Sequence, residues 1–147
     1  MNGAMNRGIR TSWVQMVLSA LLALCYTACS APLTVEGGQR VTSELLAAIQ
    51  QGELAALDQF YADKFFARMP REEWIYTLKV TQEKLGPIKN YALISSNLES
   101  SFLGAEKLKL TYRVQYEQVA FRHVFTMVEQ NGRARVLSHE VLGDVAE

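Results

Sequence analysis

The stretch LKLTYRVQYEQVAFRHVFTMVEQNGRARVLSHEVL, residues 108–142, decides the fold class of this chain. It begins with a strict alternation of apolar and polar side chains, which is the pattern of a strand with one buried face and one face in water. Farther along, Asn131-Gly132 is a strong signal for a two-residue hairpin turn. Four antiparallel strands are predicted, over residues 88–102, 108–117, 119–129 and 133–142.

The part of the chain before these strands has the spacing of helices. Leu45, Ala48 and Ile49 form an apolar stripe at intervals of three and four residues, and Gly52 follows it as a stop signal. Three helices are predicted, over residues 41–52, 53–67 and 70–85. The sequence therefore predicts an α+β fold, in which three N-terminal helices pack on a curved four-stranded antiparallel sheet.

Composition limits the classes of function. The 147 residues include 15 basic and 15 acidic side chains, and this balance argues against a nucleic-acid partner. Hydrophobic residues make up 49% of the chain, which is enough for one domain with a real core. The sequence has no zinc-binding pattern, phosphate loop or dinucleotide fingerprint, so neither a metal nor a cofactor is predicted.

The N-terminus has the pattern of a bacterial secretion signal. Arg7 and Arg10 precede an apolar segment over residues 13–26, and small residues then lead to Cys29. This arrangement resembles a lipobox, although Tyr26 stands where leucine is usual. The resemblance implies that residues 1–28 are a cleaved signal peptide and that Cys29 carries acyl lipid such as palmitate. The alternatives are ordinary cleavage after the signal and an uncleaved anchor.

This interpretation predicts the location and the domain boundaries. Resemblance to lipoproteins implies that Ser30, directly after the cysteine, favours the outer membrane, with the protein in the periplasm. Attachment of two or more acyl chains would hold it stably at the membrane. The predicted parts are a flexible tether over residues 29–40, a folded domain over 41–143 and a tail over 144–147.

Two segments carry a resemblance to a known superfamily. They are LLAAIQQGELAALDQFYADKFFARMPREEW, residues 45–74, and LKVTQEKLGPIKNY, residues 78–91. The sequence resembles the nuclear transport factor two and ketosteroid isomerase-like superfamily, and within it the small secreted or lipid-anchored members with no assigned activity. The resemblance implies a cone-shaped fold. It does not imply one function, because members include enzymes, binding modules and assembly domains.

The hairpin turn predicts which side chains share a face of the sheet. With Asn131-Gly132 as a two-residue turn, Met127 faces Val136 and His123 faces Glu140. One face then carries Phe121, His123, Phe125, Met127, Ala134, Val136, Ser138 and Glu140. The other carries Arg122, Val124, Thr126, Arg133, Arg135 and His139, and its three arginines indicate that it meets water. The prediction fails if a β-bulge shifts the register.

The predicted pair of His123 and Glu140 is the best candidate for chemistry. A carboxylate beside a histidine holds its tautomer, as acid-base catalysis requires, but such a pair is also a common structural hydrogen bond. Tyr61 and Tyr112 fall on apolar stripes, where core packing is expected, with hydroxyls toward any cavity rim. Possible ligand-binding residues are therefore His123, Glu140, Tyr112 and Tyr61, and no catalytic residue is assigned.

Three functions remain open at this stage. The first is a non-catalytic envelope lipoprotein that binds a small apolar ligand or a partner protein. The second is an acid-base enzyme, of isomerase or dehydratase type, that uses His123 and Glu140 in a cone pocket. The third is a structural module that forms homodimers through the sheet, which would require an exposed apolar face.

Overall fold

Helices come first along the chain and strands after, as the α+β prediction requires. The computed structural model describes residues 33–100 and 105–143. In chain order the elements are α2 (Val35–Gln51), the 3₁₀ helix η2 (Leu54–Gln59), α3 (Asp63–Phe66), α4 (Arg71–Leu85), β1 (Ile88–Glu99), β2 (Lys107–Tyr116), β3 (Ala120–Gln130) and β4 (Arg133–Gly143). The predicted signal peptide, Cys29 and the tail over 144–147 lie outside the described residues.

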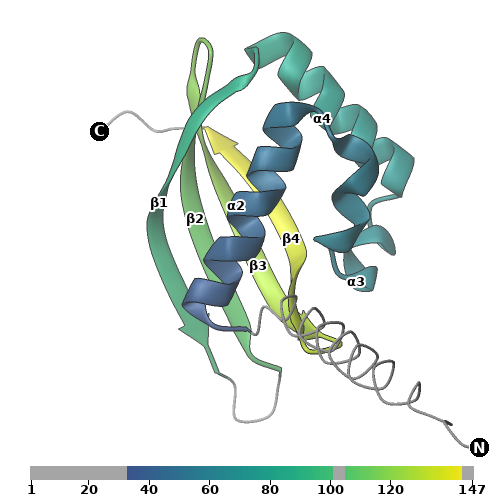
Figure 1. The fold of residues 1–147 in the computed structure, drawn as a ribbon, viewed down its shortest axis with the longest axis vertical. Helices are drawn as coiled ribbons and strands as arrows, with labels where there is room; N and C mark the ends of the chain where they lie inside the picture. The colour runs from purple at the N-terminus through teal and green to yellow at the C-terminus, as the bar shows by residue number, and fades with distance from the viewer. Residues whose placement is uncertain (1–32, 101–104, 144–147) are drawn as a thin grey trace, which may run out of the picture. The chain divides into compact units, whose positions relative to one another are not determined.

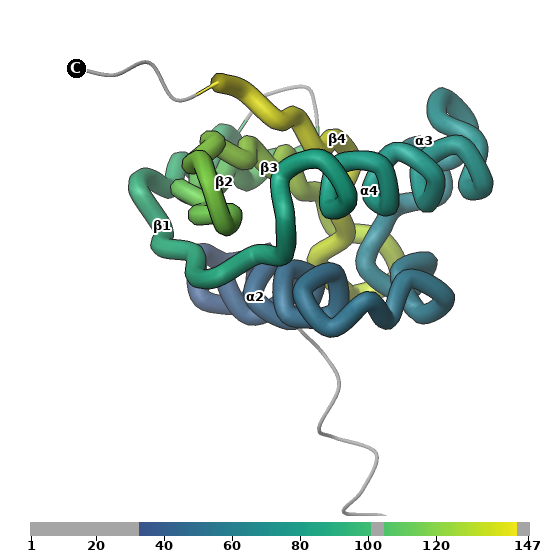
Figure 2. Tube along the Cα trace, turned by 90° about the horizontal axis from the view of Figure 1, so that it is seen from above, coloured from purple at the N-terminus to yellow at the C-terminus, as the bar shows by residue number. Residues whose placement is uncertain are grey.

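The four strands form one antiparallel sheet in the order β1-β2-β3-β4, which confirms the predicted sheet. Helix α2 crosses one face of this sheet, and α3 and α4 lie on the side of β4 (Figure 1). Viewed from above, the sheet and α2 form two layers (Figure 2). We call the face that packs against α2 the inner face and the opposite one the outer face. In the described part of the chain, no helix covers the outer face.

Helix α2 begins six residues earlier than the sequence predicts, at Val35 instead of Val41. Thr34 caps it, because its hydroxyl accepts a hydrogen bond from the Gly37 amide at 3.0 Å. The prediction of a flexible tether up to residue 40 is therefore wrong for 35–40. The reason is packing: a side chain at Gly38 would collide with Leu108 of β2, so glycine lets the helix lie close to the sheet.

The predicted helix over residues 53–67 is also wrong as a single element. The chain forms η2, then a short extended segment, then α3, because the segment pairs with β4. The Ala62 amide donates to the Val136 carbonyl at 2.9 Å, and the Val136 amide donates to the Phe60 carbonyl at 2.8 Å. These bonds satisfy backbone groups that a continuous helix would have satisfied internally.

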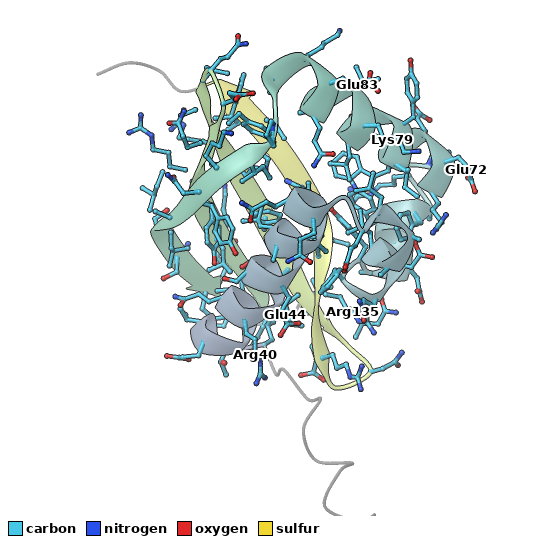
Figure 3. All side chains as sticks on the ribbon, turned by 45° about the horizontal axis from the view of Figure 1, so that its top comes forward. Arg40, Glu44, Glu72, Lys79, Glu83 and Arg135 are labelled. Atoms are coloured by element: carbon cyan, nitrogen blue, oxygen red, sulfur yellow. The ribbon has the colours of Figure 1, made fainter. Side chains whose placement is uncertain are left out.

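Helix α4 agrees with its prediction to within one residue, with Pro70 just before it and Gly86 just after it. Glu72, Lys79 and Glu83 project from α4 away from the sheet (Figure 3). All described core residues fall within residues 31–147, which form one compact unit. This part of the chain therefore contains a complete hydrophobic core and is expected to fold alone.

Candidate functional site

A β-bulge in β4 decides which polar side chains enter the core. From the turn to Met127 and Val136 the register is the predicted one. Beyond that pair the register shifts by one residue, so that Leu137 is left unpaired. The pairs after the shift are Thr126 with Ser138, Phe125 with His139, Val124 with Glu140 and His123 with Val141. The predicted pairing of His123 with Glu140 is therefore wrong.

The shift exchanges the faces of His139 and Glu140. His139, predicted on the wet face, is 8% exposed and enters the core, whereas Glu140 is exposed on the outer face. A buried neutral imidazole costs less free energy than a buried carboxylate, so this register is the favourable one. Arg68 stabilises the bulge, since its Nη2 donates to the Leu137 carbonyl at 2.6 Å. Two adjacent apolar residues, Val136 and Leu137, are the break in alternation that could have predicted it.

The inner face holds four buried side chains joined by hydrogen bonds, which we call the Tyr-His-His-Tyr chain. The Tyr116 hydroxyl lies 3.2 Å from His123 Nε2, and His123 Nδ1 lies 2.9 Å from His139 Nε2. His139 Nδ1 in turn lies 3.1 Å from the Tyr61 hydroxyl. Tyr61, Tyr116 and His123 are each 2% exposed. The structure thus brings together two of the predicted residues, His123 and Tyr61, with two that sequence reasoning did not assign.

Several elements hold this chain in place. The backbone of Tyr61 is fixed by its bridge to Val136, while β2, β3 and β4 supply the other three members. The His139 ring packs on Phe125, with ring centroids 4.2 Å apart, and meets the edge of Trp74 at 5.2 Å. The chain is therefore embedded in aromatic packing that excludes water.

Burial changes the pKa of every member of the chain. Desolvation lowers the pKa of His123 to about 4, and desolvation together with the neighbouring His123 lowers the pKa of His139 well below its ordinary value. Burial raises the pKa of Tyr116 to about 12 and that of Tyr61 further. The Trp74 indole N–H opposes the rise at Tyr61, although no hydrogen bond of normal geometry joins the two. All four side chains are consequently neutral at pH 7.

Neutral imidazoles allow two complete hydrogen-bond patterns. In one, Tyr116 donates to His123, His123 donates to His139, and His139 donates to Tyr61. In the other, every donor and acceptor is reversed. Each pattern satisfies all four ring nitrogens, so neither histidine keeps a free nitrogen that could meet a substrate.

Tyr112, the remaining predicted ligand residue, is occupied within the core. Its hydroxyl lies 2.8 Å from the hydroxyl of Thr42 on α2. The Thr42 hydroxyl donates to the Gly38 carbonyl at 2.9 Å, so Tyr112 is the donor in the bond between them. This bond ties α2 to β2 and leaves Tyr112 with a structural role.

A groove of about 520 Å³ lies between the start of α3 and the β3–β4 hairpin, and no member of the Tyr-His-His-Tyr chain lines it. Its walls are mostly apolar, with charged groups among the lining residues. The lining residues are Ala62, Asp63, Lys64, Ala105, Lys107, Val128, Glu129, Gln130 and Leu137. The groove depends on the same features as the chain, because Ala62 follows Tyr61 and Leu137 is the bulge residue.

Two further observations concern metals and membranes. Within residues 33–100 and 105–143, no group of three or more His, Cys, Asp or Glu side chains is placed to hold a metal ion. Over the same residues, no helix is both long and apolar enough to cross a membrane.

Comparisons with known proteins bear on the fold alone. No protein-family model matches the chain, and no curated protein matches it. The structure is similar to that of Bd1075 from Bdellovibrio bacteriovorus, with a TM-score of 0.53 and 14% sequence identity. The match covers 74% of this chain and 40% of Bd1075, so the chain corresponds to less than half the length of that protein.

Proposed function

We propose that this protein is a non-catalytic lipoprotein of the bacterial cell envelope, whose domain binds a small apolar ligand in the groove beside α3. The observation that carries the proposal is the groove itself: its volume of about 520 Å³ and its mostly apolar walls are typical of small-molecule sites. We also propose that the domain belongs to the nuclear transport factor two and ketosteroid isomerase-like superfamily, which the helix-then-sheet order supports.

The buried polar groups support a role without catalysis. An acid-base group must reach the proton that it transfers, and the Tyr-His-His-Tyr chain is closed off from solvent. The enzyme alternative relied on His123 beside Glu140, and these residues lie on opposite faces of the sheet. The homodimer alternative relied on an apolar sheet face, and the described outer face is mainly polar.

Native mass spectrometry of residues 31–147, secreted into the bacterial periplasm, tests the binding proposal. We expect a reproducible extra mass on the monomer and competition by the apolar probe N-phenyl-1-naphthylamine. Val128→Asn with Leu137→Asn should weaken probe binding roughly a hundredfold, because burial of each apolar side chain contributes on the order of 1.5 kcal/mol.

Tyr76→Asn is the matched control, since Tyr76 is 68% exposed on α4 and away from the groove. Equal loss of probe binding in the control and the groove variant would contradict the assignment of the groove. The anchor is tested separately, by the mass of the full chain extracted from membranes. An acylated N-terminus at Cys29 is expected, and a mature chain that lacks Cys29 would contradict the lipoprotein proposal.

A further inference from the structure

The outer face of the sheet gathers basic side chains that are far apart in the sequence. Antiparallel pairing places every second residue of each strand on this face. Its basic members are Lys107, Lys109, Arg113, Arg122, Arg133 and Arg135, and its acidic members are Glu99 and Glu140. The whole chain has equal numbers of basic and acidic residues, so the fold separates charge that the sequence balances.

Most of these charges have no partner among residues 33–100 and 105–143. Five of the six basic residues make no ion pair or side-chain hydrogen bond with any residue in the described part of the chain; they are Lys107, Lys109, Arg122, Arg133 and Arg135. Arg122 is half-buried, and its Nε is a buried donor without an acceptor. Such a donor costs folding free energy unless a further group accepts from the guanidinium.

The outer face also contains a cross-strand pair of like charges, which disfavours folding. Arg113 of β2 stands directly opposite Arg122 of β3. Like charges directly opposite one another in a sheet destabilise it. The pair adds to the positive charge of the outer face, which a negatively charged surface would attract.

We propose that the outer face of the sheet docks on the anionic phospholipid surface of a membrane. A protein partner would require an interface centre with aromatic side chains and few charges. No described residue of the outer face is aromatic, and basic residues run along it from the hairpin end to the opposite end. Basic residues spread over a face in this way match a layer of lipid phosphate groups, because that layer attracts each nearby basic side chain.

The proposed anchor brings the two surfaces together, and the docking proposal rests on that envelope location. Only five residues separate Cys29 from the start of α2 at Val35, which allows a span of at most about 20 Å even when fully extended. A domain held so close to a membrane encounters its headgroups continuously, so weak attraction is enough to orient it.

Co-sedimentation of residues 31–147 with lipid vesicles tests this proposal without the anchor. Phosphatidylcholine vesicles that contain phosphatidylglycerol should bind the domain, and pure phosphatidylcholine vesicles should not. Raising the salt concentration should weaken binding to the anionic vesicles, because the attraction is screened. Lys109→Gln with Arg133→Gln should weaken binding roughly tenfold or more, and both positions are exposed, so the fold is retained.

Lys79→Gln with Lys84→Gln is the matched control, because both lysines are exposed on α4, where Lys79 projects away from the sheet (Figure 3). The control should leave vesicle binding within about twofold of the unchanged domain. Absence of vesicle binding, equal binding to neutral and anionic vesicles, or equal losses in the two double variants would overturn the proposal. Neither Lys109 nor Arg133 lines the groove, and the domain tested lacks Cys29, so a failure of the ligand proposal or of the lipoprotein proposal is recognised separately.

Discussion

The two faces of the sheet carry polar side chains of different kinds, although their residues alternate along the same strands. On the inner face, polar side chains are neutral, buried and hydrogen-bonded to one another, as in the Tyr-His-His-Tyr chain. On the outer face, side chains such as Arg122 and Arg135 are charged and lack partners in the described protein. The difference shows that burial selects for neutrality and mutual pairing, whereas an open face can keep charge for something outside the molecule.

The bulge at Leu137 maintains this separation at the end of β4. Without it, His139 would join the arginines of the outer face and Glu140 would enter the core. Changes on the inner face should therefore cost several kcal/mol of folding free energy, and changes on the outer face should cost almost none.

The largest effect is expected from His139→Ala. The substitution opens a cavity and leaves His123 Nδ1 and the Tyr61 hydroxyl without partners, so the free energy of unfolding should fall by about 3–4 kcal/mol. Urea unfolding of residues 31–147 measures this loss. Trp74 is the only tryptophan in that segment and packs on His139, so its fluorescence reports the transition.

His139→Phe separates the two contributions, because it keeps most of the ring volume and removes only the hydrogen bonds. A loss of about 1–3 kcal/mol is expected for this variant. If His139→Ala costs less than about 1 kcal/mol, the imidazole is not the buried link that the geometry describes.

The second-largest effect is expected from acid, which should lower the free energy of unfolding through the two buried histidines. Both histidines have lowered pKa values in the folded protein, so between pH 6.5 and about 4 the unfolded chain binds protons that the folded chain does not. Stability is therefore complete above pH 6.5 and is lost as the pH falls toward 4. The shift of His123 alone corresponds to about 3 kcal/mol, and that of His139 acts in the same direction.

The double variant His123→Phe/His139→Phe is the control for this acid effect. It leaves Tyr61 and Tyr116 without partners and should be less stable at every pH, but its stability should change much less between pH 6.5 and 4. A slope in that range that survives in the double variant would assign the acid effect to other groups. Because Ala62 and Leu137 line the groove beside the chain, loss of probe binding should accompany acid destabilisation.

Local patterns predicted the parts of this fold that local interactions determine. The four strands, the Asn131-Gly132 turn and helix α4 follow from alternation, turn chemistry and end signals within each segment. Two features of the helical part did not follow, because tertiary contacts decide them. Gly38 was assigned to the flexible tether, but it lies in helix α2 close against β2. The helical spacing around Tyr61 is interrupted by pairing with Val136.

The candidate site shows the same limit more sharply. His123 was predicted to face inward from the hairpin register, and Tyr61 was predicted to lie in the core from its apolar stripe; the structure buries both. Their partner His139 was missed because a single unpaired residue, Leu137, reverses the faces of everything after it in β4. Alternation along a strand cannot predict this register shift, because the shift depends on contacts with distant segments. Arg68 donates to the Leu137 carbonyl, and the Val136 backbone pairs with the segment around Tyr61.

The smallest effect is expected on the outer face, from Arg122→Gln. Removing one charge of the cross-strand pair with Arg113 relieves repulsion, so the free energy of unfolding should rise or stay level, within about 0.5 kcal/mol, at low salt. Added salt should reduce any gain, because it screens the repulsion between the two arginines. Urea unfolding at low and high salt makes the measurement, with Lys79→Gln on α4 as the control. A loss above about 2 kcal/mol would mean that Arg122 is needed for folding, and the uncompensated charge of this face would then have to be explained as structure and not as a surface kept for negative partners.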